Sequence, residues 1–298
     1  MVHALIRPPA PVAPRKTSFD LDAISVHWLA GDPQATHTMN VGNLLFPTGE
    51  RFFNDSLRNA QPYVTDERLR QEIRGFLGQE VTHANEHERC VARMAEQGIH
   101  FEQELRWFEG FRRRLDRWVL RLPEPLRRHA VLQMLAVTAA AEHFTASLTR
   151  YVLAENTWEE SGVDADARHL WLWHAAEEIE HRHVAFDVYQ HVGGGYLRRV
   201  LTMAPLALAL PIVWPLLASE IMRRDPAARG RWRYRRHLAS ARRGHVFSLP
   251  RAVWDVRLYF KPGHHPSQLP GSLDGALRYL DEAPSVLGHR RTRAGLRS

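Results

Sequence analysis

Two copies of a Glu-x-x-His motif constrain the fold of this chain, because each copy interrupts an apolar helical stripe. The copies are Glu80 with His83 and Glu178 with His181. A helix turns by about 100° per residue, so residues three, four or seven apart share one face. The two stripes are Leu69, Ile73, Phe76, Glu80, His83, His87, Cys90 and Met94, and then Ala167, Trp171, His174, Glu178, His181, Ala185 and Val188. Both predict bundle helices that present ligand-type residues to a core.

Two further segments place a single carboxylate in the same kind of stripe. These stripes are Phe46, Glu50, Phe53 and Leu57, and then Val131, Leu135, Thr138, Glu142 and Thr145. Four helices are therefore expected to direct a carboxylate into one core. Burial of an uncompensated charge costs several kcal/mol, so these carboxylates require positive charge beside them.

Two divalent cations would neutralise four carboxylates, and imidazoles would complete their coordination. One Glu from each of two helices, with one Glu-x-x-His from each of two others, is the ligand set of dinuclear carboxylate sites in ferritin-like bundles. The sequence therefore predicts an all-α, ferritin-like four-helix bundle with a crossover helix, extra C-terminal helices and two bound metal ions. The predicted ligands are Glu50, Glu80, His83, Glu142, His174, Glu178 and His181.

The histidines beside the motifs leave alternatives open. His174 lies four residues before Glu178 on the same stripe, and we interpret it as a seventh ligand, with a supporting or core histidine as the alternative. His87 is expected to support a ligand or to line a substrate pocket. The alternative for Glu50 and Glu142 is an ion pair with an arginine. No catalytic residue beyond the metal ligands, and no residue that binds an organic cofactor, is predicted.

Several neighbours of the second motif lie off its apolar stripe. We expect Glu177 to be solvated, as well as Glu88 near the first motif. Glu180 and His183 form another Glu-x-x-His, but its stripe is more polar and is the less favoured register. Asp187 or Tyr189 is expected to hydrogen-bond a ligand imidazole, which is a common support for metal-binding histidines.

The chain of 298 residues is 44% hydrophobic and 24% charged, which is enough for one main domain with appendages. We expect a disordered segment at 1–20, the dinuclear bundle at 21–195, an apolar helical segment at 196–225 and a basic helical appendage at 226–298. Within the bundle, a helix capped by Thr65 is expected to run to Gly98, and further helices are expected over 101–122, 125–155 and 164–192. Pro47 and Gly49 are expected to kink or start a helix near Glu50.

The segment Val200–Met222 is long and apolar enough to cross a membrane, and arginines flank it on both sides. Its three prolines argue against a straight helix, which leaves a packed helix, an interfacial segment and a true span as alternatives. A basic run follows at 223–243, so we predict membrane-surface contact through 200–243. Nucleic acid is disfavoured because no recognition motif accompanies this run. The single cysteine, Cys90, favours a reducing, cytoplasmic location. With the apolar and basic segments at 200–243, we expect a cytoplasmic protein with peripheral membrane association.

Four segments carry a resemblance to known proteins: FPTGERFF, FLGQEVTHANEH, AAAEHFTASL and LWLWHAAEEIEHRHVAFDVY. They resemble a bacterial family described as predicted metal-dependent hydrolases, which belongs with the ferritin-like folds, from about Ser25 to Phe260. The order of the ligands is also similar to that of the p-aminobenzoate N-oxygenase family, whose di-iron site has an extra histidine. The resemblance implies ligand roles for the seven positions, but it implies no substrate.

Two reaction classes compete for such a site. Oxygen-rich ligands stabilise the higher oxidation states of Fe and Mn, and six or seven protein ligands leave few open positions. We therefore predict a di-iron oxygenase that acts on a small hydrophobic organic substrate with O2, with Mn or a mixed Fe/Mn pair as alternatives and Zn less favoured. The alternative function is a metal-dependent hydrolase that activates water. Metal storage is disfavoured by the apolar appendage, and a homodimer is compatible with the sequence.

Overall fold

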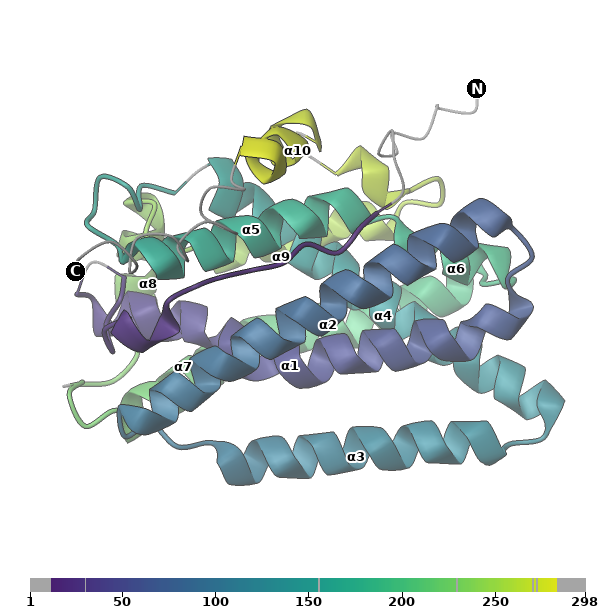
Figure 1. Ribbon diagram of the computed structural model, residues 1–298, viewed down its shortest axis with the longest axis horizontal. Coiled ribbons are helices and arrows are strands. Elements are labelled where there is room, and N and C mark those ends of the chain that lie inside the picture. Colours follow the sequence, from purple (N-terminus) through teal and green to yellow (C-terminus); the bar gives the residue numbers. More distant parts are fainter. Residues whose placement is uncertain are drawn as a thin grey trace, which may run out of the picture.

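The computed structural model describes residues 12–29, 31–154, 156–228, 230–269, 271 and 273–282. All regular structure within these ranges is helical, which confirms the all-α class. The molecule is elongated, and most of its long helices run close to its long axis (Figure 1).

Four helices form the bundle: α1 (Pro33–Ala60), α2 (Glu67–Glu96), α4 (Glu124–Ala154) and α5 (Ala165–His181). Helix α1 packs against α2 and α4, and α5 packs against the same two helices, so the four close a ring. Helix α3 (Glu102–Arg121) connects α2 to α4 along one side of the bundle, as expected for the crossover (Figure 1). This arrangement fits a ferritin-like bundle.

Aspartates begin three of these helices. The carboxylates of Asp32, Asp66 and Asp164 accept hydrogen bonds from backbone N–H groups in the first turns of α1, α2 and α5. The cap of α2 is thus one residue later than the expected Thr65. Gly98, with φ of +90°, follows the end of α2, where a left-handed residue commonly ends a helix.

Every residue of the two motif stripes is buried, as predicted. The second stripe nevertheless crosses a break, because α5 ends at His181 and α6 (Val184–His191) begins three residues later. The single helix expected over 164–192 is therefore two helices. At the break, the Arg182 guanidinium donates to the backbone carbonyls of Ser267 and Leu269, which ties the turn to the C-terminal region.

Prolines do not interrupt the helices that contain them. Helix α1 runs continuously through Pro47, so the helix neither starts nor ends near Glu50. Helix α7 (Tyr196–Arg224) is also continuous, although it contains Pro205, Pro211 and Pro215. Pro205 and Pro211 lie on its exposed side, so the carbonyls that lose a helical N–H there lie close to solvent. Helix α7 packs on α1 and α4 along its other side.

Shorter elements complete the fold. They are α8 (Tyr234–Arg242), α9 (Leu249–Val256), α10 (Leu273–Glu282) and the 3-10 turns η1 (Leu21–Ala23), η2 (Gln61–Tyr63), η3 (Arg257–Phe260) and η4 (Pro266–Gln268). Residues 12–20, which the sequence places in a disordered segment, form an extended segment with Val12 and Phe19 buried. Residues 1–11 and 283–298 lie outside the described residues.

The apolar core has two clusters, one at each end of the bundle. Helix α2, for example, contributes Ile73 and Phe76 to one cluster and Val91 and Met94 to the other. Helices α1 and α4 divide in the same way. The predicted ligands lie at the boundary between the clusters, near the middle of α1, α2 and α4 and in the C-terminal half of α5, so apolar side chains enclose them from both ends.

Candidate metal centre

The bundle brings all seven predicted ligands together. Glu50 comes from α1, Glu80 and His83 from α2, Glu142 from α4, and the remaining three from α5. None of the seven residues is more than 3% exposed. Seven ionisable side chains are therefore concentrated in the centre of the molecule.

One group of donor atoms consists of Glu80, Glu142, Glu178 and His181, whose donor atoms lie within 4.8 Å of one another. The His181 Nε2 atom lies 3.2 Å from Glu80 Oε1. It also lies 3.4 Å from Glu142 Oε2 and 3.4 Å from Glu178 Oε1. Three carboxylates thus surround one imidazole nitrogen.

A second, overlapping set includes His83, His174 and Glu50. The His83 Nδ1 atom lies 3.4 Å from Glu80 Oε1 and 3.8 Å from Glu178 Oε1. The His174 Nε2 atom lies 3.2 Å from Glu178 Oε1 and 3.9 Å from Glu50 Oε1. Glu80 and Glu178 belong to both sets, so the geometry offers two adjacent cation positions with two shared carboxylates.

Most inward-facing donor atoms have no hydrogen-bond partner among the described residues. These buried atoms are Glu50 Oε2, both carboxylate oxygens of Glu80 and of Glu142, His83 Nδ1 and His181 Nε2. Buried polar atoms in folded proteins are nearly always paired, and unpaired buried carboxylates are costly. Carboxylate oxygens and imidazole nitrogens are ligands for divalent cations, so the residues present fit a dinuclear metal site.

Burial and mutual repulsion shift the pKa values of the carboxyl groups upward. Burial raises the pKa of Glu142 to about 8, and the nearby charge of Glu178 adds to this. Burial also raises the pKa of Glu80, and with repulsion from Glu80 it raises the pKa of Glu50 well above its ordinary value. For Glu178, burial is the largest single influence and raises the pKa, but the charges and hydrogen bonds of His181 and His174 together outweigh it, so the pKa of Glu178 lies well below the ordinary value. A divalent cation that enters this site must therefore displace protons.

The histidines of the two motifs are held by residues from the opposite motif. The His83 Nε2–H donates to Glu177 Oε2 at 3.0 Å. The His181 Nδ1–H donates to Gln79 Oε1 at 2.8 Å. The orientation of Gln79 follows from its amide nitrogen, which donates to Glu180 Oε2. Each motif histidine therefore keeps its other nitrogen free for the carboxylate cluster.

His174 is oriented by a separate chain of hydrogen bonds. Asn43 donates through Nδ2 to Asn40, so its Oδ1 faces His87 and accepts from His87 Nδ1–H at 2.7 Å. The His87 Nε2 atom then accepts from His174 Nδ1–H at 2.7 Å, which leaves His174 Nε2 facing Glu178. The expectation that His87 supports a ligand agrees with this geometry.

The same chain explains a second cluster of metal-ligand residue types, formed by His27, His37 and Asp225. The Trp28 indole N–H can only donate, and it donates to Asn40 Oδ1 at 3.0 Å. The Asn40 Nδ2 atom therefore faces His37 Nδ1 at 3.3 Å, and His37 must carry its proton on Nε2. That proton is donated to Asp225 Oδ2 at 2.8 Å, so the cluster is a hydrogen-bonded group and not a set of free ligands.

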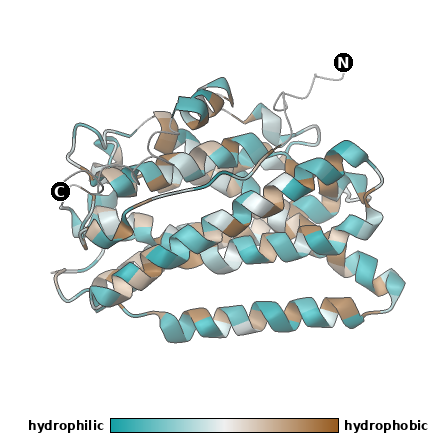
Figure 2. Ribbon diagram, viewed as in Figure 1, coloured by the Kyte–Doolittle hydropathy of each residue, from teal (hydrophilic) through white to brown (hydrophobic). Residues whose placement is uncertain are grey.

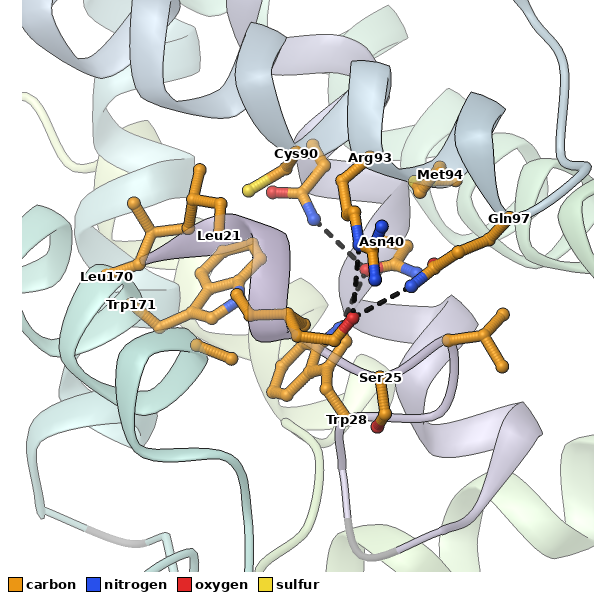
Figure 3. Close-up of a pocket in the computed structure, with 14 residues that line it drawn as sticks. Leu21, Ser25, Trp28, Asn40, Cys90, Arg93, Met94, Gln97, Leu170 and Trp171 are labelled. Atoms are coloured by element: carbon orange, nitrogen blue, oxygen red, sulfur yellow. Dashed lines mark hydrogen bonds between the residues drawn. The ribbon is translucent and has the colours of Figure 1, made fainter. Parts of the chain in front are cut away.

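A small cavity reaches the candidate metal centre. His174, Glu178 and Thr145 lie at its polar end, and Phe46 and Trp214 are among the apolar residues of its walls. Its volume of about 30 Å³ has room for water but not for an organic substrate. A second cavity of about 30 Å³ lies beside the Asn40–Asn43 pair and contains none of the seven ligands (Figure 3).

Some neighbours of the second motif differ from expectation. Glu177, which was expected to be solvated, is fully buried because it accepts from His83. Glu180 is also buried and faces away from the seven ligands, toward Gln79. Its motif partner His183 lies 3.5 Å from Glu72, so the alternative register does not reach the carboxylate cluster. Glu88 is solvated as expected, with a side chain that is 59% exposed.

The expected supports for the ligand imidazoles are also different. Asp187 contacts His265 at 2.8 Å, and the Tyr189 hydroxyl donates to the Gly195 carbonyl. These contacts are made to residues outside the seven predicted ligands. The residues that do hold the motif histidines, Gln79 and Glu177, each immediately precede the glutamate of a motif. That repeated position was the available signal in the sequence.

A family model described as predicted metal-dependent hydrolase matches residues 13–269, which is most of the chain. No curated protein and no solved structure matches the chain. The family description contradicts the prediction of an oxygenase that uses O2, and it supports the hydrolase alternative. The physical reason for the error is that carboxylate and imidazole ligands suit both reaction classes, so the ligand set indicates a metal but not its chemistry.

Proposed function

The chain belongs to the family of predicted metal-dependent hydrolases, and on this premise we propose that it uses two divalent cations to activate water for hydrolysis. The observation that carries the proposal is the set of buried, unpaired oxygen and nitrogen atoms that surround Glu80 and Glu178. Such atoms are costly in a folded protein unless a cation completes their coordination.

The proposal assigns all seven residues as ligands. One ion would be held by Glu80, Glu142, Glu178 and His181, and the other by residues of the two groups that share His83, which are Glu50 with Glu80 and His174 with Glu178. Four carboxylates and two divalent cations have no net charge, which lowers the free-energy cost of burying the site. The oxygen-rich set suits Fe²⁺ or Mn²⁺, alone or as a mixed pair, better than Zn²⁺.

Bound divalent cations act as Lewis acids that lower the pKa of water and polarise a carbonyl or phosphoryl oxygen. The protein's own contribution is to fix the ligands and to limit the access of bulk water. Glu177, Gln79 and His87 keep one proton on the outer nitrogen of each ligand histidine. The Thr145 hydroxyl donates to Glu178 Oε2 at 2.6 Å, which holds that carboxylate in place beside the cavity.

The apolar walls of this cavity favour a small hydrophobic ester or phosphoester as substrate. Phe46, Trp171 and Trp214 are large side chains that would contact such a molecule. Because the cavity holds only about 30 Å³, these side chains must move when substrate enters. Trp214 belongs to α7, so substrate entry is expected to involve that helix.

The test is hydrolysis by protein loaded with Fe²⁺ or Mn²⁺ under anaerobic conditions. The probes are p-nitrophenyl esters of increasing acyl length and bis(p-nitrophenyl) phosphate. We expect turnover that needs metal but not O2, that is lost in Glu178→Gln and that is kept in Glu88→Gln. Fully loaded protein that hydrolyses neither class of probe would contradict the proposal.

The outer face of α7 favours an additional role in contact with a membrane. Among the described residues, α7 is the one helix that is long and apolar enough to cross a membrane, by length and composition only. A core helix of the same composition would be mostly buried, whereas 17% of the most apolar window of α7 is buried. Its exposed apolar residues include Leu197, Leu201, Leu206, Leu208, Ile212, Val213 and Leu216.

We therefore propose that this face of α7 contacts the anionic, cytoplasmic surface of a membrane. The basic run at 223–243 directly follows α7, and arginines beside an apolar segment are attracted to anionic lipid by about 1 kcal/mol each. Peripheral contact would also place a hydrophobic substrate beside the helix that carries Trp214.

A further inference from the structure

Residues 12–19 form an extended segment, which we call the N-terminal strap, that runs along the bundle between α2 and α5 (Figure 1). Its Thr17 hydroxyl donates to Glu86 on α2, and its Phe19 carbonyl accepts from Arg89. Both ends of the strap are buried, through Val12 and Phe19. The strap is therefore a packed part of the bundle surface.

Two glycines of α2 allow the strap backbone to approach the helix closely. A Cβ atom on Gly75 would lie 1.8 Å from the Val12 carbonyl oxygen, and one on Gly78 would lie 2.8 Å from Pro14. Any larger residue at Gly75 would force the strap backbone outward. These glycines lie five and two residues before the predicted ligand Glu80, so the strap packs on the stretch of α2 that leads into this ligand.

Arg15 on the strap binds two buried carboxylates of α5. One guanidinium nitrogen lies 3.0 Å from Glu177 Oε1 and 2.7 Å from Glu180 Oε2. The other lies 3.0 Å from Glu180 Oε1. The Glu177 side chain is fully buried and that of Glu180 is 6% exposed, so a planar, multidentate cation is well suited to hold both.

Each of these carboxylates is connected to one motif histidine. Glu177 accepts directly from His83. Glu180 accepts from Gln79, whose carbonyl oxygen accepts from His181. Hydrogen-bonded chains from both motif histidines therefore end at the same guanidinium, on a segment far from them in sequence.

We propose that Arg15 is a positioning residue for both motif histidines, and that the N-terminal strap is a built-in part of the metal centre. The inference rests on the proposed function, since it concerns how His83 and His181 are presented to cations. Without Arg15, two adjacent buried carboxylates would repel each other and turn apart. The imidazole N–H groups would then lose their fixed acceptors, and the ligand nitrogens would lose their fixed direction.

The test compares Arg15→Gln with Lys16→Gln, which removes the same charge from the next, exposed residue of the strap. Each full-length protein is titrated with Co²⁺ against a chelator. Outer hydrogen bonds to metal-binding histidines are commonly worth a factor of about 10 to 100 in affinity, so we expect at least a tenfold loss in Arg15→Gln alone. Arg15→Lys keeps the charge without the planar fork, and partial recovery is expected.

A second variant displaces the strap without removing a charge. Gly75→Ala should weaken Co²⁺ binding as Arg15→Gln does, while Ala is itself a better helix former than Gly. Gly110→Ala is the matched control, because a Cβ there has open space around it. In NMR spectra of the Co²⁺ protein, both test variants should shift or broaden the exchangeable imidazole N–H signals of the ligand histidines.

The outcomes separate this inference from the proposed function. Wild-type protein that binds no Co²⁺ would remove the metal centre, and the inference with it. If wild type binds two Co²⁺ ions but Arg15→Gln and Gly75→Ala match their controls in affinity and in N–H signals, the positioning role is wrong. A loss of thermal stability with unchanged N–H signals would also overturn it, because it would assign Arg15 to folding alone.

Discussion

At the scale of single residues, each ligand histidine is defined by the hydrogen bond on its outer nitrogen. His174 depends on His87, which in turn depends on Asn43. The Trp28 indole and the Asn43 amide nitrogen both donate to Asn40 Oδ1, so Asn43 Oδ1 must be the acceptor for His87. The donors and acceptors along the chain therefore cannot be exchanged. A neutral imidazole with its proton on the outer nitrogen is the form that binds a metal.

This chain predicts the effect of His87→Leu. Leucine retains an apolar body of similar reach but offers no acceptor to His174 Nδ1–H. We expect two ions still to bind, with the affinity for one of them reduced by about tenfold. The measurement is a metal titration with chelator competition. His183→Gln is the control, because His183 contacts Glu72 outside the cluster, and an equal effect of both changes would contradict the chain.

A buried histidine away from the metal centre predicts a pH effect on stability. Burial lowers the pKa of His237 to about 4, against about 6.5 in an unfolded chain. The unfolded state thus binds more protons between these values. The stability present above pH about 6.5 is lost as pH falls toward about 4, by up to about 1 kcal/mol per pH unit.

Replacement of His237 by Gln should therefore flatten the dependence of stability on pH in this window. The measurement is urea denaturation at several pH values between 7 and 4, and the exposed His129→Gln variant is the control. Parallel pH profiles for wild type and His237→Gln would show that another group is responsible.

The burial and convergence of the seven predicted ligands could be predicted from the sequence, whereas the residues that hold them could not. Glu80 and His83 stand out because a polar residue within an apolar stripe is rare without compensation. Gln79 and Glu177 lie off the stripe and look solvated, and their burial depends on which helix faces them. The role of Arg15 could not be predicted for the same reason. Its proline-rich segment resembles a disordered one in sequence, and only the contacts with Glu177 and Glu180 reveal its role.

At the scale of elements, the sequence predicts where the helices are but not how they are interrupted. The helix containing Glu142 lies within one residue of its expected position. The break after His181 contains no glycine or proline. Its conformation is held by hydrogen bonds from Arg182 to the backbone carbonyls of Ser267 and Leu269, which are far away in the sequence. The three prolines of α7 do not interrupt the helix, because an exposed face tolerates the missing helical hydrogen bonds.

Helices α3 and α7 both present apolar residues outward. Figure 2 shows hydrophobic positions alternating with hydrophilic ones along α3. Among them, Trp107, Phe111 and Trp118 are each at least half exposed. On α7 the exposed face is apolar throughout, from Leu197 to Leu216. A face of that length is unusual for a monomer in water, which is why it is the better indicator of an interaction surface.

The lipid proposal predicts that Leu201→Ser with Leu208→Ser abolishes binding to liposomes. These two side chains are 63% and 73% exposed, so their loss should not affect the core. The measurement is flotation with anionic liposomes at low salt, where wild type should rise with the vesicles. The control pairs Leu126→Ser with Trp254→Ser, which are 57% and 63% exposed on other elements.

Two results would contradict lipid contact by α7. Wild-type protein that stays in solution with anionic liposomes would do so directly. A change from dimer to monomer in the Leu201→Ser, Leu208→Ser variant, without liposome binding by wild type, would instead assign the face to a second copy of the chain.

At the scale of the whole molecule, the fold surrounds a repulsive centre with two apolar clusters. Those clusters stabilise the bundle, whereas Glu50, Glu80 and Glu142 oppose folding unless they are protonated or neutralised. Cations that bind the folded state alone add stability in proportion to the logarithm of their concentration, by about 4 kcal/mol at a thousand times Kd. If the seven residues bind cations as proposed, metal binding and stability are coupled in this chain.

This coupling predicts that Glu80→Gln has opposite effects in the presence and absence of metal. Glutamine has nearly the same shape as glutamate but no charge, so without metal it removes the cost of burying a charged carboxylate, and the variant should be as stable as wild type or more so. With Fe²⁺ or Mn²⁺ under anaerobic conditions the order should reverse, because Glu80 is shared by both cation positions and its loss weakens both. Thermal denaturation of both proteins, with metal and with chelator, gives the four midpoints required. Glu88→Gln, an exposed change on the same helix, should follow wild type in both conditions. If Glu80→Gln is less stable than wild type by the same amount with and without metal, Glu80 stabilises the fold as an ordinary buried polar residue, and the seven side chains are not a metal site.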